Sequence, residues 1–460
     1  MKKAIYLIIE MKKRELDSKI LLALKAVVNG YDVVISKKSR LFEKLHLLKP
    51  GIVFLKSFGT NYDIYLKDIK DYGHKLTGLD EEGLQVSHNS WIVGKRFSIN
   101  VLNNLSCIFS WGDSAKNIYN SFIKKNKKKI KIISSGHPKI DILKNSSVKF
   151  YNIEANLIKK KYGKFVLIAT QFPRYNNDII DIKDNPEYFK EIYKGNKDVY
   201  SKSNVKLGLH QKKNFIEYYK MYKFLNKKFP NINFLVRPHP AENLNYYKEL
   251  EEKNNFNNIK VLKSNDSIIP YIISSEVLIA CNCTTSIESF LLNKYSINYV
   301  PWKDNASEFK LTKLLSLNAG NLLTLKKILK NKVYLKKNIV NKSKLNQAKK
   351  ILKNLTNENS SEIIIKNLNL LNVNLNNIDN KKQNYLNFLY FFLKVKFQNI
   401  FYYVFKRNTN LYKVQLNKRV GFNKKEIQNK VNILSKIIYP HKKFIVREKY
   451  YGLFYIEILK

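Results

Sequence analysis

Residues 232–240 read Ile232-Asn233-Phe234-Leu235-Val236-Arg237-Pro238-His239-Pro240, a short apolar run that ends in an arginine, a histidine and two prolines. An apolar run of this length predicts a buried strand, and the prolines that follow it end the strand. Residues 214–228 show helical spacing. Further buried strands are predicted at residues 165–169, 259–262, 277–280 and 297–300, with a helix over 286–292. Because strands and helices alternate, we expect a doubly wound parallel sheet here.

The first third of the chain repeats this alternation. Predicted strands lie at residues 4–9, 31–35, 52–55, 74–79, 107–111 and 131–134. The sequence therefore predicts an α/β protein of the GT-B type, in which two Rossmann-like doubly wound domains face a cleft. The predicted parts are an N-terminal domain (1–143), a charged linker (144–163), a C-terminal domain (164–356) and a basic, aromatic-rich helical extension (357–460).

The charge of the chain is extreme, with a formal net charge of +48 among 460 residues. Such an excess favours a nucleic acid or an anionic membrane as partner. A second interpretation is a biased genome, because the excess is almost entirely Lys and the codons of Lys, Asn and Ile are all AT-rich. An RNA-binding protein would explain the charge, but the sequence has no recognisable RNA-binding module.

Several features predict that the protein stays in the cytoplasm. The three cysteines, Cys107, Cys281 and Cys283, fit neither a disulfide framework nor a zinc site, so reduced thiols are expected. Glu10 and the charges after it interrupt the short apolar start before it could serve as a signal peptide. No apolar run reaches the roughly 20 residues that a membrane-spanning helix needs.

The prolines and charges at residues 237–240 lie where a parallel strand ends, which is where ligands bind in doubly wound sheets. Arg237 can hold a phosphate with its planar fork of donors. His239 can donate to a phosphate oxygen that gains charge as a glycosidic bond breaks, so it is a candidate catalytic residue as well. Pro240 completes this predicted donor site, whose alternative is a proline-rich turn without function.

Two more strand ends offer candidates for the same site. After the strand at 277–280 come Asn282, Thr284, Thr285 and Ser286, whose hydroxyl and N–H groups could hold a phosphate or simply cap the next helix. Glu288, early in that helix, could bind the hydroxyls of a ribose. Thr170 and Gln171 follow the strand at 165–169 and are predicted to contact the donor, although an ordinary loop would also fit.

The N-terminal half has an acidic turn, Asp80-Glu81-Glu82-Gly83, after the strand that ends at Leu79. Carboxylates crowded at a strand end can raise one another's pKa. One of them could then act as general base on an acceptor hydroxyl. The alternative is a solvated turn.

These motifs, in this order, resemble those of bacterial sialyltransferases and polysialyltransferases. The chain to about residue 355 resembles the bacterial surface carbohydrate biosynthesis protein family still more. The matching features are residues 13–17, the acidic turn, the segment Gly136-His137-Pro138-Lys139-Ile140-Asp141, the Arg-Pro-His-Pro run and residues 282–288. Lys139 stands where the family pattern has Arg.

The resemblance implies roles for individual residues. It implies that Glu81 is the general base and that Glu82 holds the loop through backbone N–H groups. It also implies that the His-Pro and hydroxyl motifs bind the phosphate of a CMP-activated sugar. Arg14 and Glu15 are assigned to the acceptor side, and His137 to a structural or acceptor-side role. The N-terminal domain would then bind the acceptor, and the C-terminal domain the nucleotide sugar.

The predicted function is therefore a glycosyltransferase of surface polysaccharide synthesis, for capsule or O-antigen. It would transfer a CMP-activated 2-keto acid sugar to a glycan or a lipid-linked glycan. A CDP-polyol glycerophosphotransferase and a nucleotide-sugar 2-epimerase are alternative enzymes. The sequence shows no metal-ligand spacing, so the reaction is expected to need no metal and no cofactor.

The C-terminal extension predicts a contact with the inner face of the cytoplasmic membrane. Aromatic residues between Tyr385 and Phe405 are interleaved with Lys394 and Lys396, and Lys406 follows directly. This composition suits the interface of an anionic bilayer. The alternative is a helix that packs on the catalytic domains.

Overall fold

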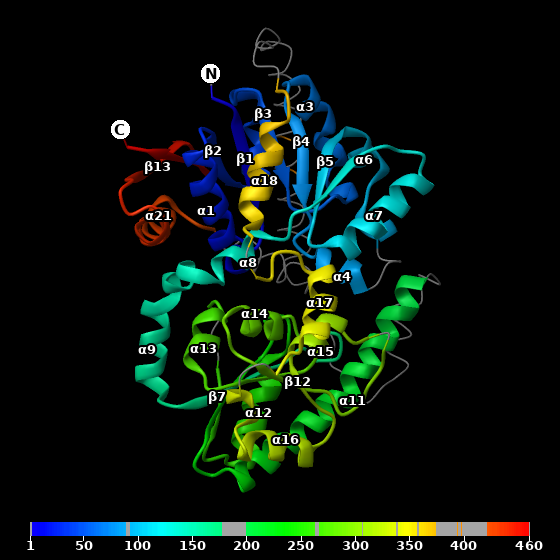
Figure 1. The fold of residues 1–460 in the computed structure, drawn as a ribbon, viewed down its shortest axis with the longest axis vertical. Coiled ribbons are helices and arrows are strands. Elements are labelled where there is room, and N and C mark those ends of the chain that lie inside the picture. The colour runs from blue at the N-terminus through cyan, green and yellow to red at the C-terminus, as the bar shows by residue number, and fades with distance from the viewer. Residues whose placement is uncertain are drawn as a thin grey trace. The chain divides into compact units, whose positions relative to one another are not determined.

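The computed structural model describes residues 2–88, 93–176, 199–262, 266–305, 307–336, 339–356, 358–373, 393, 397 and 421–459. The chain divides into two units (Figure 1). The first unit combines Met1–Phe150 with Lys349–Lys460, and the second is Tyr151–Ala348. The second unit is therefore inserted into the chain of the first.

The sheet of the first unit has eight strands among the described residues, in the order β13-β14-β2-β1-β3-β4-β5-β6. Their bounds are β1 Ala4–Ile9, β2 Asp32–Lys37, β3 Gly51–Leu55, β4 Lys75–Leu79, β5 Leu105–Ser110, β6 Lys131–Ser134, β13 Phe444–Tyr450 and β14 Leu453–Ile458. Strands β1 to β6 are parallel. The order reverses between β1 and β3, because the chain adds β2 on one side of β1 and β3 to β6 on the other.

Helices cover both faces of this sheet, as buried apolar parallel strands require. In Figure 1, α18 crosses in front of the sheet, and α1, α8 and α18 contact one another. The helices are α1 Lys12–Val28, α2 Lys38–Glu43, α3 Leu66–Asp71, α4 Gly83–His88, α5 Val93–Arg96, α6 Ile99–Asn104, α7 Asp113–Lys125, α8 Pro138–Ile142, α18 Ser360–Asn369 and α21 Lys424–Ile438.

The second unit has a parallel sheet in the order β12-β11-β10-β7-β8-β9. Its strands are β7 Phe165–Ala169, β8 Asn233–Arg237, β9 Ile259–Val261, β10 Leu278–Ala280, β11 Ser296–Tyr299 and β12 Leu317–Ala319. Its helices are α9 Asn152–Tyr162, α11 Val199–Lys228, α12 Leu244–Asn254, α13 Ile269–Ser274, α14 Thr285–Leu291, α15 Lys310–Leu315 and α16 Leu322–Lys330, and α17 Lys342–Ile351 runs back to the first unit. The strand order reverses between β7 and β10.

The predicted α/β class with two Rossmann-like domains is confirmed. All eleven strands predicted from apolar runs are present, because a strand buried on both faces has to be apolar throughout. The region predicted as a linker, 144–163, instead contains α9, where Ser274 donates to the carbonyl of Ala155 at 2.6 Å.

The region predicted as a C-terminal extension also differs. The helix α18 and residues 421–459 belong to the first unit, because the hairpin β13–β14 pairs antiparallel with β2. The predicted aromatic segment 385–405 lies outside the described residues, apart from Leu393 and Phe397.

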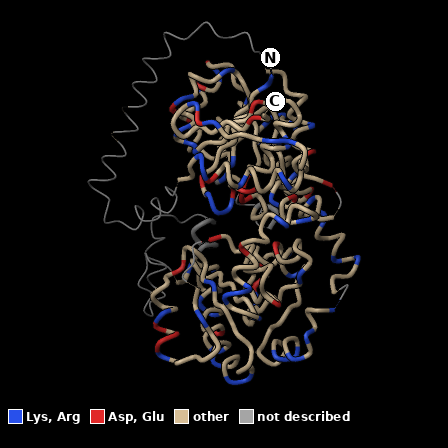
Figure 2. Tube along the Cα trace, turned by 90° about the vertical axis from the view of Figure 1, so that its left-hand side faces the viewer, with Lys and Arg blue, Asp and Glu red and all other residues tan. Residues whose placement is uncertain are grey.

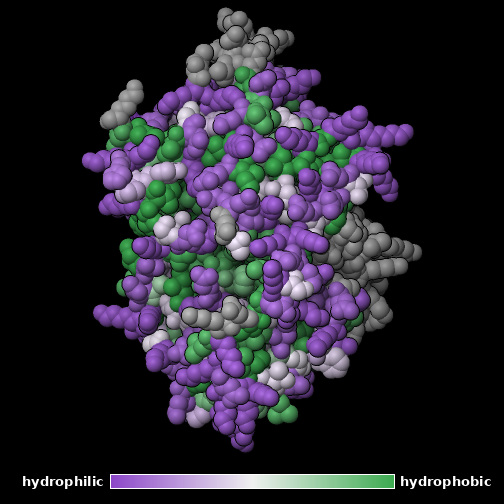
Figure 3. Space-filling model, viewed as in Figure 1, coloured by the Kyte–Doolittle hydropathy of each residue, from purple (hydrophilic) through white to green (hydrophobic). Residues whose placement is uncertain are grey.

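Charge is distributed over both units. Lys and Arg recur along the traces of both units and outnumber Asp and Glu (Figure 2). On the face that Figure 3 shows, hydrophilic side chains are interspersed with smaller apolar areas. None of the helices in the described ranges is long and apolar enough to cross a membrane.

Candidate functional site

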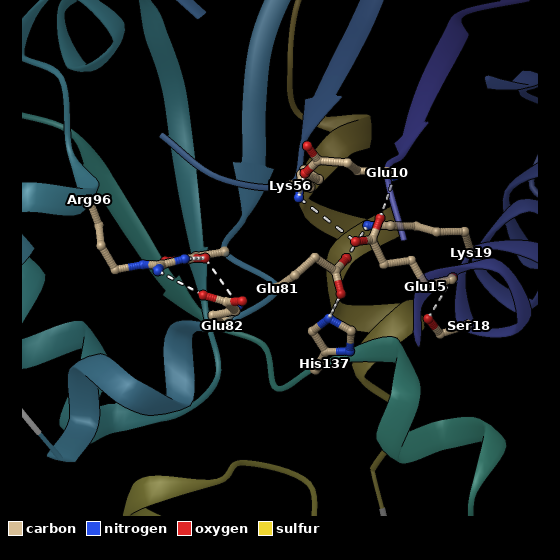
Figure 4. A network of polar contacts seen from close by, with 10 residues as sticks. Glu10, Glu15, Ser18, Lys19, Lys56, Glu81, Glu82, Arg96 and His137 are labelled. Carbon is tan, nitrogen blue, oxygen red and sulfur yellow. Dashed lines mark hydrogen bonds and ion pairs between the residues drawn. The ribbon is translucent and has the colours of Figure 1, made fainter. Parts of the chain in front are cut away.

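The carboxyl ends of β1, β3, β4 and β6 bring several charged residues together in the first unit (Figure 4). The group consists of Glu10 after β1, Lys56 after β3, Glu81 after β4 and His137 after β6, with Glu15 and Lys19 from the first turns of α1. Glu81, Glu15 and His137 were predicted from the sequence, and the fold brings these three together.

Glu81 lies at the centre of this group. Its two oxygens contact Lys19 Nζ at 2.8 Å and His137 Nε2 at 2.9 Å. The Lys19 side chain is only 1% exposed, and its ammonium also lies over the Phe54 ring. Burial raises the pKa of Glu81, but Lys19 and His137 outweigh burial and hold the pKa well below its usual range. Glu81 is therefore an ionised carboxylate with a low affinity for protons.

The orientation of His137 follows from its two ring nitrogens. Nδ1 accepts the backbone N–H of Lys139 at 3.0 Å, so in the neutral ring the proton is on Nε2 and is donated to Glu81. The indole of Trp111 stacks on the imidazole at 4.2 Å between ring centroids. With its side chain 1% exposed and both nitrogens engaged, His137 could affect an acceptor only through Glu81.

Glu15 differs from Glu81 although it lies beside it. Its side chain accepts the backbone N–H of Glu10 at 2.8 Å, and Lys56 Nζ is 3.8 Å away. Burial and the charge of Glu81 raise its pKa, against the smaller effect of Lys56. Lys56 also pairs with Glu10. Arg14, by contrast, is exposed on α1.

The remaining carboxylates of the acidic turn are held by Arg96. Asp80 is buried and accepts from Arg96 Nε at 2.6 Å, while the largely exposed Glu82 accepts from Nη1 at 3.0 Å. The loop is held by Asp80, which accepts the backbone N–H of Glu82 at 3.1 Å. The role predicted for Glu82 in holding the loop was therefore wrong, because its carboxylate points away toward Arg96.

Gly83 allows Trp111 to pack against this turn. A Cβ atom at Gly83 would lie 2.6 Å from Cδ1 of Trp111. The indole Nε1 donates to the backbone carbonyl of Asp80 at 2.6 Å. Trp111 therefore links the acidic turn to His137.

Besides supplying His137, the segment 136–141 connects β6 to the start of α18. The carboxylate of Asp141 accepts the backbone N–H groups of Ser360 at 2.9 Å and Ser361 at 2.8 Å, where α18 begins. Gly136 has a φ of +73°, and a Cβ there would meet the Ser360 hydroxyl at 2.4 Å. The segment thus joins the two parts of the chain that form the first unit.

In the second unit, the predicted donor residues lie after three neighbouring strands. Strands β10, β7 and β8 are adjacent, and the strand order reverses between β7 and β10. Ligands bind at the carboxyl ends of strands on either side of such a reversal. Thr170 and Gln171 follow β7, residues 237–240 end β8, and residues 281–286 follow β10.

Arg237 is the buried cation of this edge. It is 8% exposed, its guanidinium lies 5.6 Å from the centre of the Tyr271 ring, and Nη2 donates to the carbonyl of Asp266. Burial lowers its pKa, against the smaller effects of Tyr271 and the nearby Glu288. Its Nε has no hydrogen-bond partner among the described residues.

His239 repeats the local geometry of His137. Its Nδ1 accepts the backbone N–H two residues ahead, that of Ala241, at 3.2 Å. The neutral ring therefore carries its proton on Nε2 and can donate from that atom. His239 is half-buried and Pro240 is exposed.

The hydroxyl segment after β10 divides into two parts. No side chain caps α14, and Thr285 Oγ1 and Ser286 Oγ are buried without hydrogen-bond partners among the described residues. Thr284 is exposed. Asn282 differs, because its amide donates to Ser307 and accepts from the backbone N–H of Phe309 at 2.6 Å. Asn282 therefore holds a neighbouring loop, and its predicted contact with the donor does not fit these bonds.

Cysteine chemistry has no support at this edge. Cys281 and Cys283 are buried thiols outside any disulfide, and burial raises the pKa of Cys281. Cys283 Sγ contacts the predicted donor residue Gln171 at 3.5 Å. Among the described residues, no three His, Cys, Asp or Glu side chains are placed to hold a metal ion.

No family model and no curated protein matches the sequence. Solved structures do match at low similarity. A putative UDP-N-acetylglucosamine 2-epimerase from Listeria monocytogenes is 13% identical, with a TM-score of 0.49 over 80% of this chain and 96% of the other. The UDP complex of S. aureus MnaA is 13% identical, with a TM-score of 0.46 over 81% and 98%. The wall teichoic acid polymerase TagF is 12% identical, with a TM-score of 0.40 over 80% and 88%.

Several residues of these edges were missed by sequence reasoning. Lys19 and Arg96 are lysine and arginine side chains on helices, and their carboxylate partners are set by the fold. Lys56 follows a strand directly and could have been found from that position. Glu242 was missed as well, although it lies three residues after His239. It is 2% exposed and accepts hydrogen bonds from both the β7 and β8 exits.

Proposed function

We propose that the chain is a nucleotide-sugar enzyme of surface polysaccharide synthesis, which transfers a CMP-activated 2-keto acid sugar to a glycan or lipid-linked glycan. The observation that carries the proposal is the set of anion-binding groups at the strand reversal of the second unit. Arg237 Nε, Thr285 Oγ1 and Ser286 Oγ are buried polar atoms that no described protein group satisfies. Buried polar groups without partners are rare in folded proteins, and a phosphate would supply acceptors for all three.

His239 supports the same assignment. Its tautomer presents Nε2–H as a donor, which suits a phosphate oxygen that gains charge as the bond to the sugar breaks. Glu288 lies near Arg237 and is buried, so we assign it to a polar group of the nucleotide such as a ribose hydroxyl.

The first unit supports an acceptor role. Glu81 is ionised and oriented by two donors, and we propose that it attracts the proton of the acceptor hydroxyl. Its lowered pKa makes it a weak base, so the ion pair with Lys19 and the hydrogen bond from His137 would have to lengthen as it takes up the proton. As Glu81 becomes neutral, the repulsion by which its charge raises the pKa of the neighbouring Glu15 is relieved.

Nucleotide binding to the full-length protein tests the proposal. Calorimetry with CMP, CDP, UDP and GDP should find CMP the tightest ligand. Arg237→Gln should weaken binding by about 10- to 100-fold, because it removes a charge-assisted hydrogen bond. Arg447→Gln, at a half-exposed arginine of β13, is the matched control and should bind as the wild type does. The proposal fails if no nucleotide binds, or if both variants bind equally well.

The products separate the alternative enzymes. A transferase needs an acceptor before it consumes the nucleotide sugar, whereas a 2-epimerase converts the nucleotide sugar alone. A polyol-phosphate transferase would respond to CDP-polyols. An RNA-binding protein would bind RNA with a steep dependence on salt and would ignore all four nucleotides.

Contact with an anionic membrane remains part of the proposal. The aromatic segment that suggested it lies mostly outside the described residues, so its support is composition alone. Phe388→Ser with Phe392→Ser should reduce sedimentation with phosphatidylglycerol vesicles while leaving nucleotide affinity unchanged. Equal sedimentation of variant and wild type would contradict the membrane contact.

A further inference from the structure

Glu242, between β8 and α12, is a buried carboxyl group that accepts four hydrogen bonds from described residues. Its Oε1 accepts from Phe172 N at 2.8 Å, Thr170 Oγ1 at 2.9 Å and His239 N at 3.3 Å. Its Oε2 accepts from the hydroxyl of Tyr247 on α12. The residue is 2% exposed, so solvent water contributes little to stabilising a charge on its carboxyl group. All of these partners donate, which matches an ionised carboxylate.

No cation compensates the charge of Glu242 within the described residues. Its stabilisation comes from hydrogen bonds to neutral donors, whereas Glu81 in the first unit is paired with Lys19. Burial raises the pKa of Glu242 to about 7, against the opposing effect of Phe172, Tyr247, Thr170 and His239. Near neutral pH the group is therefore present in both protonation states.

The bonds of Glu242 join two loops of the proposed nucleotide site. Thr170 and Phe172 lie in the exit of β7, and His239 lies in the exit of β8. A hydrogen bond to a charged acceptor is roughly twice as strong as one between neutral groups. Protonation of the carboxyl would weaken its hold on both loops at once. The added proton on Oε2 would also face the hydroxyl hydrogen of Tyr247, which would have to turn away.

We infer that Glu242 is a positioning residue, whose carboxylate holds the β7 and β8 exits in the arrangement that binds the nucleotide phosphate and whose protonation releases them. The inference rests on the proposed function. Because protonation of Glu242 releases the two loops, nucleotide affinity should fall as the pH drops through neutrality. Glu242 itself contacts no ligand in this mechanism.

The tyrosines and the cysteine that face Glu242 cannot produce the same pH dependence. Tyr247 on α12, Tyr222 on α11 and Cys281 after β10 interact with it electrostatically, and burial raises the pKa of each. They stay neutral below pH 8. Protonation of His239 would add positive charge near the phosphate, but the proton would enter Nδ1 and break the bond from Ala241 N. Glu242→Gln leaves His239 unchanged, so the variant separates the effects of the two groups.

The test measures the affinity of the full-length protein for its best nucleotide monophosphate between pH 6 and pH 8.5. If the protonated form does not bind, wild-type affinity should fall about tenfold between pH 8 and pH 6. Glu242→Gln keeps the shape of the side chain and mimics the protonated group. The variant should bind weakly at every pH. The only pH dependence left in its affinity should be the one caused by protonation of the nucleotide, which wild type and variant share.

Tyr247→Phe keeps the test valid if Glu242→Gln fails to fold. It removes the donor to Oε2 and leaves the three bonds to Oε1, so the midpoint of the pH curve should move up by at least half a unit while affinity at pH 8.5 stays within about twofold. A merely structural role would not move the midpoint. If nucleotides bind and all folded variants share the wild-type curve, the inference is overturned and the proposed function stands. If no nucleotide binds at any pH, both are overturned.

Discussion

Two carboxyl groups, Glu81 and Glu242, are both largely removed from water, but their pKa values are shifted in opposite directions. Glu81 has a lysine and a histidine within 3 Å, and its pKa lies below the usual range. Glu242 has more hydrogen bonds but only neutral donors, and its pKa is raised to about 7. In these two sites, the charge of the partners shifts the pKa more than the number of hydrogen bonds does.

Glu81→Gln should lower kcat by roughly 10²- to 10⁴-fold, the usual contribution of a general base, with nucleotide affinity unchanged. Glu82→Gln is the matched control, because Glu82 is largely exposed and its carboxylate points to Arg96. It should retain most of the activity. Transfer rates and nucleotide affinities of the two variants check this. Equal activity of Glu81→Gln and the wild type would leave the acidic turn without a catalytic role.

Gly83→Ala should destabilise the first unit by about 1–3 kcal/mol, because the added methyl group would overlap the indole of Trp111. Gly94→Ala is the control. The nearest atom to a Cβ at Gly94, on Phe122, is 3.8 Å away, and alanine favours a helix more than glycine does. Urea unfolding compares the two. If both variants are as stable as the wild type, the Trp111 side chain can shift to admit a methyl group at residue 83 without lowering the free energy of unfolding.

At the scale of elements, the sequence predicts strands better than it predicts the partners of strands. Runs such as residues 4–9 and 165–169 match β1 and β7, because a central parallel strand is apolar on both faces. The hairpin β13–β14 was missed although its signal is present. Two β-prone runs flank Tyr451-Gly452, and Gly452 has a φ of +78° as a tight turn requires. The basic composition of the region hid this pattern.

The candidate sites show the same division. Glu81, His137 and Arg237 could be predicted because functional residues of doubly wound sheets follow strand ends. Lys19, Arg96 and Tyr247 could not, since they reach these positions from helices whose packing the sequence does not specify. Asn282 follows a strand end too, but its neighbour is a loop of the same unit.

Phe454→Ala should destabilise the first unit by about 3–5 kcal/mol, as the loss of a buried phenyl ring does elsewhere. Phe454 on β14 is 4% exposed and pairs with Ile35 of β2. Arg447→Ala, on the adjacent strand β13 with its side chain 55% exposed, should change stability by less than about 0.5 kcal/mol. Chemical unfolding measures both. An equally small effect of the two would mean that the hairpin contributes nothing to the fold.

At the scale of the whole molecule, the chain order makes the two units unequal. Residues 151–348 are continuous and have their own sheet and core, so this fragment should fold when it is expressed alone. Residues 1–150 alone lack α18 and the hairpin, which leaves Asp141 and the edge of β2 without partners. Circular dichroism during heating should show a cooperative unfolding transition for fragment 151–348 and none for fragment 1–150. A cooperative transition of fragment 1–150 would contradict the dependence.

The pairing of β14 with β2 also affects how the protein is made. Because Phe454 pairs with Ile35, more than 400 residues that follow β2 must leave the ribosome before this sheet is complete. At about 5–20 residues per second, β2 spends roughly 20 to 80 seconds with its outer edge unpaired. An open strand edge is a template for pairing with other chains, including other nascent copies on the same messenger RNA. Rapid translation and chaperones that cover this edge should therefore increase the yield of folded protein in the cell.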